Sequence, residues 1–319
     1  MKLEDIGFYT LSNERAKKTS MTSPLHRCEL LLTDRCNFHC VYCRGLKNGG
    51  DLDLGEAKRI LEYWISNGLQ NIRFSGGEPT LYPDLFELVD ICKKAEVEHI
   101  AISTNGSSRK VYYVELIKSG VNDFSISLDA CCSTVGDTMS GVKGFYDHII
   151  ANIEALSQLT YVTVGVVYNE KNEKEIYSII QLAHDLGVSD IRIIPSAQYN
   201  KPLKIEVDSP IIESHPILKY RMGNHRLARG LSGGDTGKCK LVLDDMAVWN
   251  SYHYPCIIYL REGGTPIGQI GENTREERFE WYKHHNSYED KICLHNCLDV
   301  CIEYNNRCNE YEKSKDSED

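Results

Sequence analysis

CELLLTDRCNFHCVYC, residues 28–43, joins an apolar run typical of a buried β-strand to three closely spaced cysteines. The apolar run ends at Thr33, so Cys36, Cys40 and Cys43 lie on the loop that follows the strand. In (β/α) enzymes, the loops at the carboxyl ends of parallel strands assemble the active site. Three thiolates on one such loop can hold three irons of a 4Fe–4S cluster and leave the fourth iron open to a ligand.

A zinc site is the alternative interpretation of the same loop, because zinc also binds clustered cysteines. Zinc normally needs four protein ligands, and the spacing allows His39 to supply the fourth. The chain would then be a zinc-binding interaction protein on an α/β scaffold. Iron and sulfide analysis would distinguish the two.

Further strand-like segments follow the first, and helical patterns separate them. They are residues 71–76, 99–104, 123–129, 161–167 and 190–195. Between the first two, an apolar stripe with helical spacing is suited to packing on a sheet; its members are Ala57, Ile60, Leu61, Trp64 and Ile65. Strands that alternate with helices form parallel βα units. The sequence therefore predicts an α/β fold with a partial (β/α)6 TIM-like barrel.

Composition limits the possible functions. The 319 residues, 41% of them hydrophobic, can bury one large core and a smaller one. No signal peptide and no apolar run of about 20 residues is visible, so we expect a cytoplasmic protein without a membrane partner. The net charge of −10 argues against a nucleic-acid partner, which would favour a basic face.

Thirteen cysteines in a chain of this size, without an export signal, favour metal or redox chemistry over disulfides. Besides the first group, a second group comprises Cys239, Cys256, Cys293, Cys297, Cys301 and Cys308. The remaining cysteines lie in or beside apolar segments, where a thiol is usually a small buried side chain.

The C-x3-C-x2-C motif, with Tyr42 before its last cysteine, resembles the radical S-adenosylmethionine (AdoMet) superfamily over residues 26–200. The resemblance implies that Cys36, Cys40 and Cys43 bind a 4Fe–4S cluster and that Tyr42 lies near the cofactor. The open iron binds AdoMet in that family, and an electron from the cluster cleaves it. The resulting 5′-deoxyadenosyl radical abstracts hydrogen from the substrate. A reductase, flavodoxin or ferredoxin would supply the electron.

Other segments match this family in order, each at the end of a predicted strand. In SGGEPT, Gly76 and Gly77 allow close backbone approach, and Glu78 can accept a hydrogen bond from the AdoMet ammonium group. We expect further cofactor contacts from short polar and apolar side chains at the same barrel mouth, namely Ser103, Asn105, Ser127 and Val167.

Asp129 is a candidate for contact with cofactor or substrate, although it could instead cap a helix. Cys131 and Cys132 follow it, and a thiol outside the clusters could return a hydrogen atom in an epimerisation. Their ordinary interpretation is two small loop or core residues.

The second cysteine group resembles the C-terminal extensions called SPASM and twitch, which carry auxiliary iron–sulfur clusters. The resemblance implies at least one auxiliary cluster on Cys239, Cys256, Cys293 and Cys297. Cys301 and Cys308 would be substitutes or members of a second cluster. On one helix, the cysteines at 293, 297 and 301 would share a face. A reduced helix face or a structural zinc site is the alternative.

The predicted organisation has five parts. An N-terminal extension (1–25) precedes the barrel (26–200), a polar linker (201–235) follows it, and a SPASM/twitch-like domain (236–312) opens with a β-hairpin. We expect a disordered charged tail at 313–319.

The resemblance favours radical modification of a peptide or protein by crosslinking, oxidation or epimerisation. With little chain before Cys36, a separate recognition protein or direct binding would be needed. Oxidation or rearrangement of a small molecule, such as a sugar or nucleotide, is the alternative. Nucleotide cyclisation in molybdenum-cofactor synthesis is less favoured, since the expected terminal double glycine is absent from the end, KDSED.

Overall fold

The computed structural model describes residues 9–45, 50–223 and 226–316. The first eight residues of the predicted extension and the last three of the predicted tail lie outside this range. Within it, none of the helices has the length and apolarity needed to cross a membrane.

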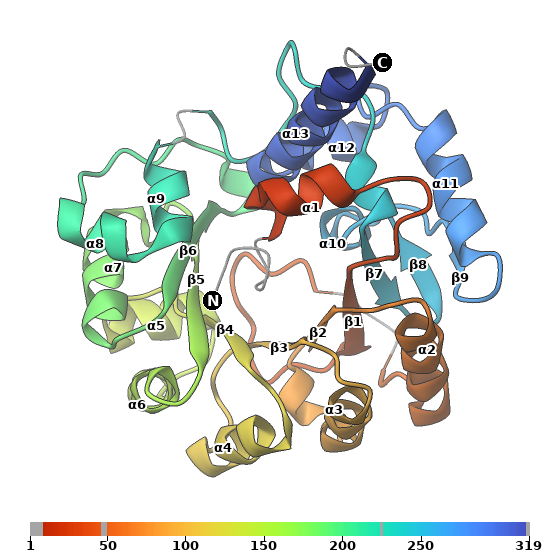
Figure 1. Ribbon diagram of the computed structural model, residues 1–319. Helices are drawn as coiled ribbons and strands as arrows, with labels where there is room; N and C mark the ends of the chain where they lie inside the picture. Colours follow the sequence, from red (N-terminus) through yellow and green to blue (C-terminus); the bar gives the residue numbers. More distant parts are fainter. Residues whose placement is uncertain (1–8, 46–49, 224–225, 317–319) are drawn as a thin grey trace.

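The six predicted strands are present, and a seventh parallel strand joins them. They are β1 (Arg27–Thr33), β2 (Asn71–Gly76), β3 (His99–Thr104), β4 (Asp123–Ser127), β5 (Tyr161–Tyr168), β6 (Asp190–Pro195) and β7 (Asp245–Trp249). The sheet order is β6-β5-β4-β3-β2-β1-β7-β8-β9, and the pairs from β6 to β7 are parallel. The sheet curves without closing, with helices outside (Figure 1), which confirms the predicted partial barrel.

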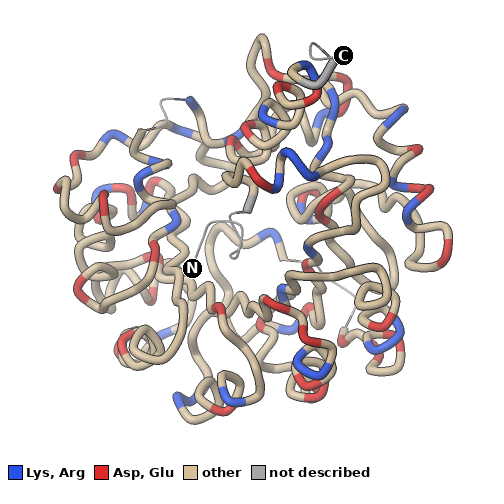
Figure 2. The backbone as a smooth tube through the Cα atoms, viewed as in Figure 1, with Lys and Arg blue, Asp and Glu red and all other residues tan. Residues whose placement is uncertain are grey.

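Helices with one apolar side cover the outer face of this sheet. They are α2 (Leu54–Ser66), α3 (Leu85–Lys94), α4 (Lys110–Ser119), α6 (Tyr146–Ser157) and α7 (Ile176–Asp185), whereas α5 (Ser133–Ser140) contacts α6 and borders the cavity at the strand ends. In α2, the Asp53 carboxylate caps the first turn by accepting from the Glu56 N–H. Its predicted stripe is buried except for Ile65, which is half-buried. Basic and acidic positions are interspersed around these outer helices (Figure 2).

The predicted β-hairpin exists, but it continues the barrel sheet. Strands β7 and β8 (Tyr252–Tyr254) are antiparallel and turn at Asn250 and Ser251, which both have positive φ. Strand β9 (Gly268–Gln269) pairs with β8. Parallel pairing of β7 with β1 covers an edge that β1 would otherwise expose.

Part of the predicted linker packs on the barrel. It contains α8 (Ser209–Ser214) and α9 (Pro216–Gly223), and α9 contacts β6. Ile211, Ile217 and Leu218 are buried there. This part of the predicted polar linker therefore has a short apolar face that packs on the barrel.

The C-terminal region adds α10 (Ile257–Arg261), α11 (Thr274–His284), α12 (Lys291–Asn296) and α13 (Asp299–Asp316). Because α13 continues to Asp316, the predicted disordered tail does not begin at residue 313. Cys297 lies between α12 and α13, so the expectation of one helix face for three cysteines is also wrong. The helix is interrupted there, and Leu298 makes an antiparallel β-bridge with Arg229.

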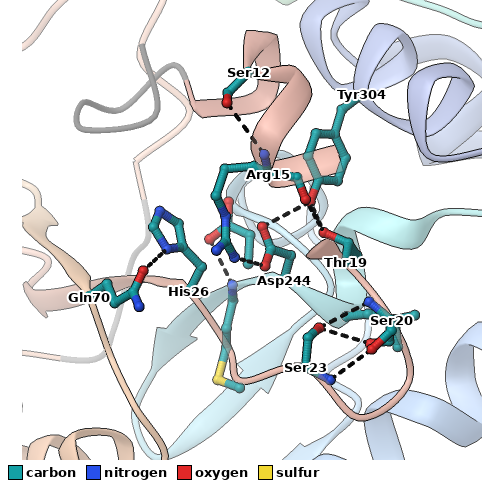
Figure 3. A network of polar contacts seen from close by, with 12 residues as sticks. Ser12, Arg15, Thr19, Ser20, Ser23, His26, Gln70, Asp244 and Tyr304 are labelled. Atoms are coloured by element: carbon teal, nitrogen blue, oxygen red, sulfur yellow. Dashed lines mark hydrogen bonds and ion pairs between the residues drawn. The ribbon is translucent and has the colours of Figure 1, made fainter. Parts of the chain in front are cut away.

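The N-terminal residues dock on the C-terminal helix. Helix α1 (Asn13–Lys18) packs against α13 (Figure 1). At this junction Asp244 accepts from Tyr304 Oη at 2.8 Å and forms an ion pair with Arg15 (Figure 3). Short 3-10 helices complete the fold at Tyr9–Leu11, Pro79–Leu81, Glu173–Glu175, Ala197–Tyr199 and Lys240–Leu243.

Candidate active site and C-terminal cysteine group

The loop after β1 places three cysteines at a cavity of about 420 Å³. Cys36, Cys40 and Cys43 all line it. The loop is fixed from the side by backbone hydrogen bonds from His39 and Val41 to the segment that ends α5, at 2.8 and 3.0 Å. Burial, followed by the charge of Asp129, raises the pKa of Cys40 to about 12, so a bound metal would have to displace the thiol proton.

Most of the other predicted cofactor residues line the same cavity. They are Tyr42, Gly76, Gly77, Ser103, Asn105, Ser127 and Val167, together with Asp129. Tyr42 lies on the loop after β1, and the others come from β2, β3, β4 and β5 and from the loops after these strands. Parallel strands end at one edge of the sheet, which explains why segments far apart in sequence meet here.

Glu78 is fully buried and does not form part of the cavity wall. Its Oε1 accepts from the backbone N–H and the hydroxyl of Thr80, at 3.1 and 2.7 Å, and from the Thr104 hydroxyl at 2.7 Å. Its Oε2 accepts from the Asn105 N–H at 2.7 Å. Burial raises the pKa of Glu78, and these hydrogen bonds act in the opposite direction. The carboxyl therefore joins the loops after β2 and β3, a role that sequence did not predict.

Gly76 and Gly77, the two residues before Glu78, lie against the end of β1 and its loop. A Cβ at Gly77 would stand 2.2 Å from the Arg35 carbonyl oxygen. At Gly76, where φ is +142°, a Cβ would stand 2.3 Å from the Thr33 carbonyl oxygen. Both contacts are with backbone, so only glycine lets this loop approach the cysteine loop so closely.

Asp129 contacts Tyr42 inside the cavity. Tyr42 Oη donates to Asp129 Oδ2 at 2.6 Å, and the Val167 N–H donates to Oδ1 at 2.7 Å. Burial raises the pKa of Asp129 to about 6, although both hydrogen bonds favour the ionised form. The Asp129 carboxyl can therefore gain or lose a proton near neutral pH within the cavity.

Cys131 and Cys132 lie outside the cavity wall. The Cys131 thiol donates to Glu175 Oε2 at 2.9 Å, and Cys132 is exposed before the first turn of α5. This arrangement gives no support to the predicted hydrogen-atom transfer. It agrees better with their ordinary interpretation as loop residues.

Five cysteines of the second group surround a smaller cavity. Cys239, Cys256, Cys293, Cys297 and Cys301 line it. Cys308 does not line it; it is buried with Ala16, Leu241 and Tyr304 in a cluster against which Cys239, Cys256 and Cys301 also pack. Cys256 and Cys301 also line the larger cavity, so the two cavities are adjacent.

The spacing of the sulfurs bears on the choice between a cluster and a single zinc ion. Tetrahedral zinc with Zn–S bonds of about 2.3 Å holds its sulfurs about 3.8 Å apart. Within the described part of the chain, the one group of metal-binding atoms that all lie within 4.8 Å of one another is that of His285, Asp290 and Cys293. Cys293, which lines the smaller cavity, belongs to this set, and within the described residues neither cysteine group contains three sulfurs that close together.

Sequence reasoning missed the arginines of the larger cavity. Six arginines line it, and they come from separate segments: Arg27, Arg44, Arg73, Arg192, Arg229 and Arg261. No spacing rule marks an arginine as facing a cavity, so no signal for them was present in the sequence.

Comparison with known proteins gives a family. Residues 30–183 match the model described as the radical SAM superfamily. A probable GTP 3′,8-cyclase of Saccharolobus solfataricus is 32% identical over 176 residues, which cover 54% of this chain and 57% of that protein. An AdoMet-dependent heme synthase of Methanosarcina barkeri is 31% identical over 162 residues, which cover 49% and 46%. The matched part spans about half the length of these curated relatives.

Solved structures support the fold. Streptococcus suis SuiB bound to S-adenosylmethionine has a TM-score of 0.60 at 18% identity, over 88% of this chain and 72% of that one. Native anSMEcpe with bound AdoMet has a TM-score of 0.60 at 14% identity, over 91% and 98%. Together with the cysteine loop, the family match shows that residues 30–183 form a domain of the radical SAM superfamily, whose members use a 4Fe–4S cluster and AdoMet, and the two solved structures agree with this chain in fold.

Proposed function

We propose that this enzyme modifies a peptide or protein by radical chemistry, through crosslinking, oxidation or epimerisation of a residue. One observation carries the proposal: a single cavity at the carboxyl ends of the strands is bounded by Cys36, Cys40 and Cys43 and also by Cys256 and Cys301. A substrate in this cavity would lie between the two cysteine groups.

The chain's own residues have distinct proposed roles at this cavity. The first three cysteines would hold the 4Fe–4S cluster, and Gly76 and Gly77 would admit AdoMet beside it. When bound, cluster and AdoMet supply a 5′-deoxyadenosyl radical that abstracts hydrogen from the substrate. Asp129, with its pKa of about 6, would accept or hold a proton, and Tyr42 would orient its carboxylate.

An auxiliary cluster would be held by four of the five cysteines around the smaller cavity. Our ligand set remains Cys239, Cys256, Cys293 and Cys297, and the position of Cys301 makes it an equal candidate. Because two of these five also face the larger cavity, the auxiliary cluster could take an electron from a substrate radical. The donor of the first electron would be a flavodoxin, a ferredoxin or a reductase.

A peptide substrate gains support from a structural neighbour. SuiB has been solved with its precursor peptide SuiA, and that structure has a TM-score of 0.58 with this chain at 18% identity. The second candidate, radical rearrangement of a nucleotide or other small molecule, is favoured by the names of the curated relatives, which include GTP 3′,8-cyclases.

The first test measures 5′-deoxyadenosine released from AdoMet by anaerobically reconstituted, chemically reduced protein. We expect release by the original chain and by the Cys92→Ala control, because Cys92 is buried in α3 away from the cavity. Cys40→Ala should release none above background. Equal release by the Cys40→Ala variant would contradict the proposed chemistry.

The second test assigns the substrate class. A cell extract that increases 5′-deoxyadenosine release is treated with protease and stripped of peptides before a second assay. Loss of the increase supports a peptide or protein substrate. An increase that survives this treatment, or one produced by GTP alone, supports the small-molecule alternative.

A further inference from the structure

A segment of the predicted linker lines the larger cavity, which both cysteine groups border. Two backbone hydrogen bonds join this segment to the residues between α12 and α13. The Asp299 N–H donates to the Ala228 carbonyl at 3.0 Å, and the Gly230 N–H donates to the Cys297 carbonyl at 2.9 Å. Asn200 Nδ2 donates to the Arg229 carbonyl at 3.0 Å. The backbone of Arg229 is therefore fixed from both sides.

The side chain of Arg229 is a buried cation on this wall. The residue is 4% exposed and lines the larger cavity. Its Nε donates to the Pro195 carbonyl at 3.3 Å, and its Nη1 has no hydrogen-bond partner among the described residues. Burial, followed by the charges of Arg44 and Arg221, lowers the pKa of Arg229 to about 10, which leaves it protonated at neutral pH.

Two more arginines, Arg44 and Arg261, line the same cavity. Burial lowers the pKa of Arg44, and the nearby charge of Arg261 lowers it further. Arg44 has an ion pair with Glu262, whereas Arg261 donates to the Gly76 carbonyl at 3.3 Å. Arg221, near Arg229, is neutralised by Asp299. We name Arg44, Arg229 and Arg261 the arginine wall: among the described residues Glu262 forms an ion pair with it, and the charges of Asp299 and Glu29 lie near Arg229 and Arg261 without a hydrogen bond to Arg229 Nη1.

A buried cation without an anionic partner is costly, and a protein retains it where a ligand supplies the anion. We propose that the arginine wall binds an anionic oxygen group of the substrate, a carboxylate or a phosphate, and so fixes the substrate between the two cysteine groups. This inference rests on the proposed function. Guanidinium groups suit both anions because they donate paired hydrogen bonds to planar or tetrahedral oxygens.

The test is anaerobic calorimetry on the reconstituted, AdoMet-loaded enzyme, with two anionic probes. One probe is inorganic pyrophosphate, and the other is a short blocked peptide with a central glutamate, compared with its glutamine counterpart. We expect one of the two anions to bind and the glutamine peptide to bind more weakly than the glutamate peptide. Arg229→Gln should lower the affinity for that anion by at least about tenfold, and Arg229→Lys should lower it by less, because lysine keeps the charge.

The controls separate this role from others. Arg109→Gln removes the same charge from an exposed site outside the cavity and should leave anion affinity unchanged. Iron content and the electron paramagnetic resonance signals of Arg229→Gln should match those of the original chain. Binding of neither anion, or an unchanged affinity in Arg229→Gln, would overturn the inference. An equal loss of AdoMet affinity would also overturn it, because the anion would then be the AdoMet carboxylate.

The proposed function can be wrong while this inference holds. Anion binding needs no AdoMet cleavage, so a protein that binds pyrophosphate but forms no 5′-deoxyadenosine would retain the anion site and lose the radical chemistry. Preference for the glutamate peptide over pyrophosphate would point to a peptide substrate. The reverse preference would point to a phosphorylated small molecule.

Discussion

Glu78 shows how one buried carboxyl can organise a cofactor site. It accepts hydrogen bonds from Thr80, Thr104 and Asn105, which belong to the loops after β2 and β3. Such bonds to an ionised group are stronger than neutral ones. Loss of the acceptor would release both loops, including Asn105 at the cavity wall.

Glu78→Gln should therefore weaken AdoMet binding by at least about tenfold, because an amide NH2 group cannot accept from the donors that now face Oε1 or Oε2. Equilibrium dialysis of AdoMet against the reconstituted protein would measure this. Glu87→Gln is the matched control, since Glu87 pairs with Lys58 on the outer helices. AdoMet affinities within twofold of each other for the two variants would contradict the assigned role.

Gly77→Ala should destabilise the cysteine loop, because the added methyl group would meet the Arg35 carbonyl oxygen at 2.2 Å. Overpacking of this kind costs roughly 1–3 kcal/mol. Gly233→Ala is the control, since no atom lies within 4 Å of the Cβ it would add. Thermal unfolding of both variants gives the comparison, and an unchanged midpoint for Gly77→Ala would show that the β1 loop can move away.

At the scale of elements, the docking of α1 on the C-terminal region depends on Asp244. Burial raises the pKa of Asp244 to about 6, although Arg15 and Tyr304 both lower it (Figure 3). Because the folded pKa lies above the ordinary value, the folded state holds the extra proton between the two values. This group's contribution to stability is therefore present at low pH and is lost as the pH rises through about 6.

Arg15→Gln should enlarge this loss of stability between low and high pH. At pH 8 the variant would bury an ionised carboxylate without its cation, which costs about 3–5 kcal/mol. At pH 5 Asp244 is protonated, so the cost should be smaller. Denaturant unfolding at the two pH values measures the difference, with Lys18→Gln, an exposed residue of the same helix, as the control. A cost that does not depend on pH would refute the importance of the Asp244 charge.

For the whole molecule, the two cysteine groups belong to one continuous architecture. Strand β7 pairs with β1, and the first three cysteines follow β1 directly, so the C-terminal region shares the sheet that carries the cluster loop. The adjacent cavities follow from this pairing.

The iron content should report both groups separately. The original chain should bind about eight irons, about four at each site. A variant with alanine at 36, 40 and 43 should keep about four, and so should one with alanine at 239, 256, 293, 297 and 301. Iron and acid-labile sulfide assays after anaerobic reconstitution measure this. About twelve irons would contradict a single auxiliary cluster, and zinc without sulfide would favour structural metal sites.

The sequence alone was sufficient for the barrel strands and the cysteine loop. These features depend on local patterns, because strand periodicity and the spacing of Cys36, Cys40 and Cys43 are properties of short segments. The GGEP loop was also located correctly at the mouth of the barrel. Its glycines are readable in sequence because only they permit such close backbone approach.

Tertiary structure alone decided the rest. The pairing of β7 with β1, the burial of Cys308 outside the smaller cavity and the anchoring of Arg229 beside Cys297 each depend on segments far apart in the chain. Periodicity carries no information about which distant segments meet. Packing of the core and pairing of sheet edges select those contacts. The sequence by itself thus predicted the cysteine loop and its place at the end of β1, and only the fold determined which residues face that loop.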